Sequence, residues 1–137
     1  EAIETLVPIV VWRKEFRPDS GGSGKYRGGL GQSVEFSAIS DTHLNLIAQF
    51  DRVDHPAQGR AGGRAGAAGI VKLASGKRLN GKGRQVIPAG ERLVIDLPGG
   101  GGYGDPSERS QSEIADDVKR GFVSAANARR DYPQFEG

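Results

Sequence analysis

The chain has 137 residues, enough for one domain with its own core, and its 19 basic and 17 acidic side chains give a net charge of +2. It has no cysteine, which excludes disulfides, thiolate metal sites and a cysteine nucleophile. The basic residues are scattered along the chain, and no apolar run approaches the roughly 20 residues of a membrane span. These features predict a soluble, cytoplasmic protein that binds neither nucleic acid nor membrane.

The first part of the chain is typical of an antiparallel sheet. Segments rich in β-branched and aromatic side chains predict strands at 4–16, 33–40 and 43–52, and a hairpin at 70–80. Pro8 marks a sheet edge or a strand start, because proline cannot donate to a ladder.

Residues 85–98 predict a turn at 88–90 and then a strand. In that strand Leu93, Ile95 and Leu97 alternate with Arg92, Val94 and Asp96. The alternation predicts one covered face and one wetter face.

The last part of the chain predicts a helical hairpin. Ser110 and Glu113 have the spacing of a capping box, Gly121 can end the first helix, and Ser124 can cap the second. We expect the hairpin to cover a sheet face, with a core of Leu93, Ile95, Leu97, Ile114, Val118 and Phe122. The predicted fold class is α+β: a mainly antiparallel β-sheet body with glycine-rich loops over residues 1–109 and a C-terminal helical hairpin over 110–137, packed together as one domain.

Four consecutive glycines, followed by Tyr103 and Gly104, contain the pattern G-x-G-x-x-G of dinucleotide-binding turns. That turn needs a helix that begins on the glycines, whereas here Asp105 and Pro106 follow and the capping box begins only at Ser110. The lack of a following G-K-[ST] excludes a P-loop. We therefore favour glycines that let the backbone approach another surface closely, with Tyr103 as an aromatic peg among them; a ligand or partner against the loop remains compatible with this.

Catalytic candidates in the sequence are few. The segment DRVDHP, residues 51–56, offers two carboxylates and an imidazole, enough in principle for a metal or an acid–base pair. A solvated or hydrogen-bonded turn is the favoured interpretation. Ser20, Ser23 and Ser107 lack a nucleophile elbow or a nearby base, which disfavours a serine nucleophile.

The order of the glycine-rich blocks is more distinctive than any one of them. RPDSGGSGKYRGGLGQ, FDRVDHPAQGRAGGRAG and PGGGGYGDP, with the helical hairpin after them, resemble the C-terminal end of the hydantoinase B family. That family includes B subunits of ATP-dependent N-methylhydantoinases, the matching half of 5-oxoprolinases, and subunits of acetone and acetophenone carboxylases. The resemblance covers nearly the whole chain.

The resemblance implies a part of an ATP-dependent amidohydrolase that opens cyclic amides such as hydantoins or 5-oxoproline. It implies that ATP and a divalent metal serve the full complex and that this chain binds neither. The implied partners are the remainder of the B-type subunit and an A-type ATP-binding subunit, in a hetero-oligomer. The alternatives are the same domain of an ATP-dependent ketone carboxylase, or a purely structural interaction domain.

The resemblance also indicates binding or interface residues, but no catalytic residue and no metal ligand: Arg27, Gly28, Gly29, Asp51, Arg52, Gly99, Gly100, Gly101, Gly102, Tyr103, Gly104 and Asp105. Arg27 could bind an anionic group as a bidentate donor or brace its own loop, and bracing is favoured. The glycines could hold a substrate-side surface through backbone N–H groups or pack against the rest of the subunit, and packing is favoured.

Overall fold

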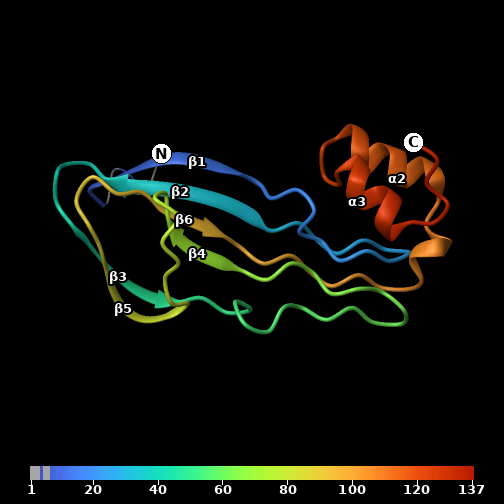
Figure 1. The fold of residues 1–137 in the computed structure, drawn as a ribbon, viewed down its shortest axis with the longest axis horizontal. Coiled ribbons are helices and arrows are strands. Elements are labelled where there is room, and N and C mark those ends of the chain that lie inside the picture. The colour runs from blue at the N-terminus through green and yellow to red at the C-terminus, as the bar shows by residue number, and fades with distance from the viewer. Residues whose placement is uncertain (1–3, 5–6) are drawn as a thin grey trace.

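The computed structural model describes residue 4 and residues 7–137. Strands lie at one end of the molecule, glycine-rich segments extend from them, and helices cover the far end (Figure 1). The strands are β1 (Ile9–Phe16), β2 (Gln32–Ala38), β3 (Leu44–Gln49), β4 (Ile70–Leu73), β5 (Lys82–Ile87) and β6 (Leu93–Asp96). They are followed by the 3-10 helix η1 (Pro106–Glu108) and the helices α2 (Gln111–Lys119) and α3 (Ala125–Asp131).

The strands form two antiparallel sheets, one of four strands in the order β1-β2-β6-β4 and one two-stranded ribbon of β3 and β5. The turn at residues 41–42 therefore joins strands of different sheets. β1 is an edge strand that begins directly after Pro8, as the proline predicts. The predicted strand extends back to residue 4, which is wrong at Glu4, Val7 and Pro8, since the strand begins only at Ile9; residues 5–6 lie outside the described residues.

The main core lies between the two sheets. Leu93 and Ile95 of β6 are buried with Val71, Leu73 and Ile87, and Leu97 packs against them as the alternation predicts. The core list from the sequence is thus right for the sheet half of the molecule.

The predicted wet face of β6 is wrong at Val94, which is only 6% exposed. β6 is a central strand, and Val94 lies directly opposite Glu35 on β2 and Lys72 on β4. The hydrocarbon parts of these two long side chains can shield the valine while their charged ends reach water.

The helical hairpin is built as its capping residues predict. Ser110 and Glu113 form a complete capping box, and Gly121 ends the helical segment with a φ of 71°. Among the described residues, no helix has the length and apolar character to cross a membrane.

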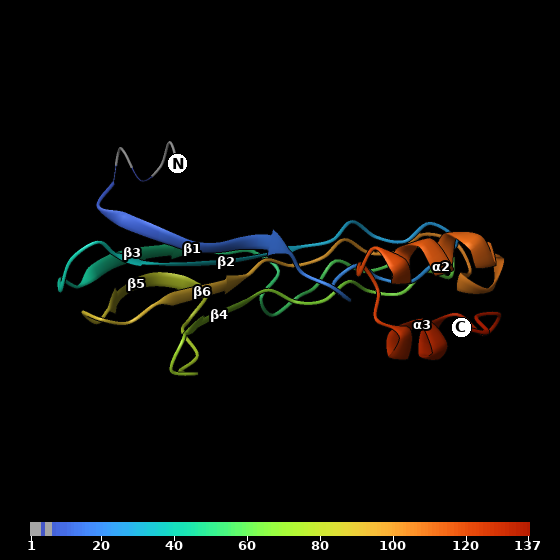
Figure 2. The same cartoon turned by 90° about the horizontal axis from the view of Figure 1, so that it is seen from above.

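The expectation that the hairpin covers a sheet face is wrong. Ile114, Val123, Ala128 and Tyr132 form a second core cluster of their own, separate from the one between the sheets. Figure 2 shows both helices at the end of the molecule opposite β3 and β5. Phe122 is not part of either buried cluster; its ring contacts the ring of Phe16 edge-on, with centroids 6.1 Å apart.

Candidate functional site

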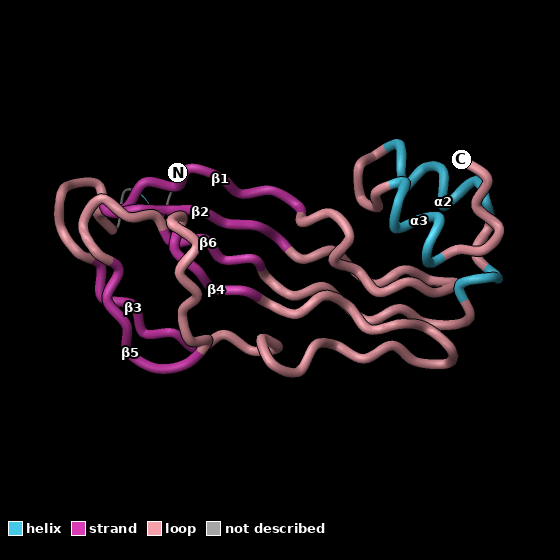
Figure 3. The backbone as a smooth tube through the Cα atoms, in the orientation of Figure 1, coloured by secondary structure: helices cyan, strands magenta, loops and turns pink. Residues whose placement is uncertain are grey.

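The glycine-rich segments lie side by side as extended chains between the sheets and the helices (Figure 3). We name this structure the glycine bundle and define it as residues 20–31, 57–69 and 97–105. The N–H groups of Arg64 and Ala67 donate to the carbonyls of Ser23 and Ser20, both at 2.8 Å. The carbonyls of Arg64 and Ala67 in turn accept N–H groups from the tetraglycine segment, residues 99–102, at 2.9 and 3.1 Å. Bonds that recur every third residue have the repeat of polyproline II chains rather than of β-strands.

Glycine is required in the bundle because carbonyl groups occupy the space of a side chain. A Cβ atom on Gly28 would overlap the carbonyl of Gly100, and one on Gly99 would overlap the carbonyl of Ser20. Gly29 is different, since nothing lies within 4 Å of its Cβ position. The predicted close backbone packing is present, and the contacts join segments of this chain to one another. Packing against the rest of a larger subunit stays a prediction.

Most N–H groups of residues 99–104 are already used inside the bundle. Four of them donate to carbonyls at 2.9–3.1 Å: Gly99 to Ala67, Gly100 to Gly29, Gly102 to Arg64 and Gly104 to Arg60. The segment leads into a 3-10 helix of 3 residues, and the first α-helix after it begins only at Gln111. A phosphate-binding turn needs free N–H groups at the start of a helix, so this geometry does not offer one.

Tyr103 pairs with Tyr26 at the surface of the bundle. Each backbone N–H donates to the other residue's carbonyl at 2.9 Å, and the ring centroids lie 6.4 Å apart. The Tyr103 side chain is 56% exposed, so it is not the peg between glycine segments that we expected. The two rings instead form an exposed aromatic pair, and two reciprocal backbone hydrogen bonds join the residues that carry them.

Asp105 is the last residue of the glycine bundle and the N-cap of η1. Its carboxylate accepts hydrogen bonds from the Ser107 hydroxyl at 2.7 Å and from the Ser107 N–H at 2.8 Å. These bonds lower the pKa of Asp105 below its ordinary value. The residue therefore has a local capping role in this structure.

Arg27 binds a carboxylate of the helical hairpin. Its Nε and Nη2 donate to the two oxygens of Asp117 at 2.9 and 3.3 Å, and its Nη1 donates to the carbonyl of Gly28 at 2.8 Å. Arg109 donates to the same carboxylate at 2.9 Å and to the carbonyl of Lys25 at 3.0 Å. We name Arg27, Asp117 and Arg109 the arginine brace.

The arginine brace is largely removed from water. The side chains of Arg27, Arg109 and Asp117 are 16%, 10% and 9% exposed. One guanidinium comes from the glycine bundle, and the carboxylate comes from α2, so the brace joins the two. Arg27 thus makes a bidentate contact with an anionic group of this chain, the Asp117 carboxylate, and also donates to the Gly28 carbonyl of its own loop.

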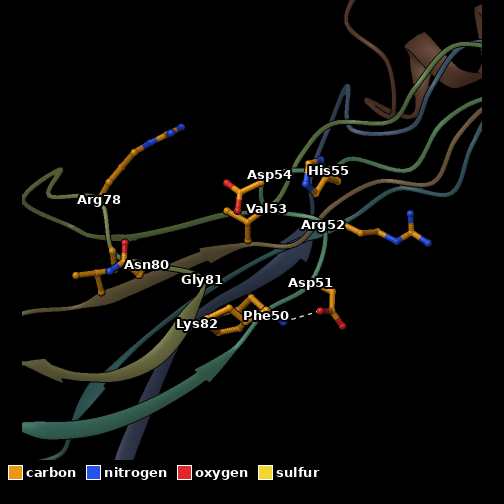
Figure 4. Close-up of a pocket in the computed structure, with 11 residues that line it drawn as sticks. Phe50, Asp51, Arg52, Val53, Asp54, His55, Arg78, Asn80, Gly81 and Lys82 are labelled. Carbon is orange, nitrogen blue, oxygen red and sulfur yellow. Dashed lines mark hydrogen bonds and ion pairs between the residues drawn. The ribbon is translucent and has the colours of Figure 1, made fainter.

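The DRVDHP segment lines an open hollow of about 510 Å³ after the end of β3 (Figure 4). Asp51 accepts a hydrogen bond from Lys82 at 2.6 Å, and Arg52 has a φ of 57°, which is uncommon for a residue with a side chain. In Figure 4 the Arg52 guanidinium extends away from Asp51. Within the described part of the chain, no three His, Asp or Glu side chains are grouped to hold a metal ion.

A model of the family described as hydantoinase B/oxoprolinase matches residues 1–106. The chain belongs to this family. It is 41% identical over 135 residues to an uncharacterized protein of Methanocaldococcus jannaschii, a match that covers 96% of this chain and 24% of that protein. It is 32% identical over 147 residues to caprolactamase subunit beta of Pseudomonas jessenii, again covering 96% of this chain and 24% of the relative.

A solved structure agrees with these matches. The crystal structure of the ATP-dependent caprolactamase from Pseudomonas jessenii is similar to this hydantoinase B-type chain with a TM-score of 0.80 and 27% sequence identity. The similarity covers 98% of this chain and 24% of that one. The chain thus spans about a quarter of the length of each of these relatives.

The site residues predicted from the sequence do not include Asp117 and Arg109, the two other members of the arginine brace. A signal for Asp117 was present: it follows Ile114 by three residues and precedes Val118, so it lies on the apolar face of its helix. A carboxylate on a buried face needs a cationic partner. The sequence did not show which arginine would supply it.

The ion pair at the hollow leads to a testable pH effect. The hydrogen bond and charge of Lys82 lower the pKa of Asp51 below its ordinary value. We expect Lys82→Ala to raise the pKa of Asp51 toward that value, as measured by NMR titration of its carboxyl carbon. The pKa of Asp105, which depends on Ser107, is the internal control and should not move. An unchanged Asp51 pKa would show that the ion pair is not populated in solution.

Proposed function

We propose that this chain is a supporting module of a hydantoinase B-type subunit in a cytoplasmic, ATP-dependent enzyme that hydrolyses cyclic amides. It supports the amide-hydrolysing site and the contact with an A-type ATP-binding subunit. The names of the relatives favour this substrate class, since caprolactamase acts by name on a lactam, and hydantoins and 5-oxoproline are cyclic amides as well.

The observation that carries the proposal is the glycine bundle with its arginine brace. Backbone hydrogen bonds hold the segments of the bundle to one another, and a buried ion pair attaches the helical hairpin to the bundle. Such a unit can hold distant surfaces at a set separation, because many of its backbone N–H and carbonyl groups are paired with a neighbouring segment.

The nucleotide belongs, in this proposal, to the A-type subunit, and the divalent metal to the remainder of the B-type subunit. The use of the glycine N–H groups inside the bundle supports this division, because a phosphate would have to displace four internal hydrogen bonds. The chain's own contribution is positioning rather than bond breaking.

Asp105→Ala in the assembled enzyme tests the proposal. The hydrogen bonds of the Asp105 side chain in the described structure all come from Ser107, so the change removes the cap of η1 and leaves the backbone hydrogen bonds of the bundle and the arginine brace in place. We expect an enzyme that assembles normally but hydrolyses its cyclic amide more slowly, because η1 no longer holds the end of the tetraglycine segment. Assembly is measured by size-exclusion chromatography with light scattering, and turnover by ATP hydrolysis that depends on the amide.

Each other outcome of this experiment has a defined meaning. Dissociation or unfolding of the complex would assign the module a purely structural role. Unchanged assembly with unchanged turnover would contradict support of the site. The turnover assay also tests the substrate class. If ATP hydrolysis is stimulated by a ketone with bicarbonate but not by caprolactam, a hydantoin or 5-oxoproline, the enzyme is a ketone carboxylase and not a cyclic-amide hydrolase. Arg27→Ala is unsuited to this test, because it breaks the buried brace.

A further inference from the structure

Asn80 lies on the rim of the hollow after β3, between the β4 hairpin and β5, and it is followed by Gly81 (Figure 4). Its side chain is exposed, and its side-chain amide has no hydrogen-bond partner among the described residues. The other asparagines of the chain, Asn45 and Asn127, precede leucine and alanine. Asn80 is thus the asparagine whose next residue has no side chain.

We propose that Asn80 is a site of spontaneous deamidation. The backbone nitrogen of Gly81 loses its proton and attacks the side-chain carbonyl carbon of Asn80, forming a C–N bond and a five-membered succinimide. The bond from that carbon to the side-chain nitrogen breaks, and ammonia leaves with the proton. Water then opens the ring at either carbonyl, which yields aspartate or isoaspartate. The reaction needs no partner other than water.

The position of Gly81 favours the attack. A glycine places no side chain over the attacking nitrogen, and its backbone reaches more conformations than that of any other residue. The Gly81 N–H donates to no carbonyl or side chain in the part of the chain that the structure describes. The nucleophilic nitrogen is therefore not held by a competing hydrogen bond.

The side chain of Gln85 opposes the reaction. Its carbonyl oxygen accepts the Asn80 N–H at 3.0 Å, and its amide donates to the Asn80 carbonyl at 2.6 Å. These two bonds tether the Asn80 backbone on both sides of the reacting side chain. The rate in the folded protein is therefore set by how often this tether opens.

The product changes the hollow in two ways. Either product adds a carboxylate to the rim of the hollow, which Arg78 and Lys82 also line, and lowers the net charge of the chain from +2 to +1 by converting one neutral amide into one anion. Isoaspartate adds a methylene group to the backbone just before β5, which begins at Lys82 and pairs there with Gln49. The register of the two-stranded ribbon is then under strain at its end.

The test follows the full-length protein in mildly alkaline buffer by peptide mapping and mass spectrometry, with an enzymatic assay for isoaspartate. We expect the peptide with Asn80 to gain the mass of an amide-to-carboxyl exchange and to contain isoaspartate, while the peptides with Asn45 and Asn127 stay unchanged. Gln85→Ala should accelerate the change, because it releases the tether. Asn80→Ser should abolish it.

Two results would overturn the proposal. One is an Asn80 that stays intact in the folded protein over a period in which the urea-unfolded chain deamidates there. The other is modification of Asn45 or Asn127 as fast as of Asn80. A rate that is unchanged by Gln85→Ala would overturn the role of the tether.

Discussion

Gly28→Ala is expected to destabilise the protein by about 3 kcal/mol or more, which is at or above the usual range for overpacking a well-packed site. The added methyl group would lie inside contact distance of the Gly100 carbonyl, and the neighbouring Gly101 carbonyl is close as well. Because these atoms are backbone, no side chain can rotate away to make room. The segments must separate, and the bonds that join them are lost together. Urea-induced unfolding, followed by circular dichroism, measures the effect.

Gly29→Ala is the matched control for this experiment. It makes the same chemical change one residue later, where nothing lies within 4 Å of the new methyl group. We expect a change of no more than about 1 kcal/mol in either direction. Equal destabilisation by the two substitutions would show that loss of glycine flexibility, not backbone packing, determines the stability of the bundle.

Asp117→Ala is expected to cost about 3–5 kcal/mol, the usual effect of removing one partner from a buried ion pair. The substitution leaves the guanidinium groups of Arg27 and Arg109 without their shared carboxylate, at side-chain exposures of 16% and 10%. Their remaining bonds are to backbone carbonyls, which do not neutralise the charge. We also expect Asp117→Ala to speed the exchange of amide hydrogens in the helical hairpin more than in the sheets, because the variant lacks the brace that connects the hairpin to the bundle.

Asp116→Ala, at the adjacent position of the same helix, is the control for the brace. Asp116 forms an ion pair with Arg120 at 2.8 Å, but the two side chains are 51% and 61% exposed. Exposed pairs of this kind contribute little, so we expect a loss of no more than about 0.5 kcal/mol. Similar losses for the two aspartates would contradict a buried, stabilising brace. Thermal unfolding of both variants under one set of conditions decides between these outcomes.

Much of the secondary structure was predictable because its causes are local. The capping box of Ser110 and Glu113 lies within four consecutive residues, and it is complete in the structure. The hairpin turn at Gly76 and the bend at Gly90 need positive φ angles of 95° and 76°, which glycine adopts without strain. The close backbone packing of the glycine blocks was predictable for the same reason, since a residue without a side chain permits it.

The errors concern contacts between distant parts of the chain. Periodicity showed that Ile114 lies on a buried face, but not that this face belongs to a separate core. The alternation of β6 predicted a wet side for Val94, because it does not reveal that both neighbouring strands carry long side chains opposite that residue. An amphipathic pattern states that a surface is covered and does not state what covers it.

The sequence by itself determined the antiparallel strands, the capped helices and the places where main chain must approach main chain. Only the tertiary structure decided that the glycine segments pair with one another, that Arg27 meets Asp117 ninety positions away, and that the hairpin lies on the bundle rather than on a sheet. The physical reason is the distance along the sequence over which each kind of interaction acts. Backbone conformation and capping depend on residues a few positions apart, whereas the partner of a buried charge or of a bare backbone is selected by the packing of the whole chain.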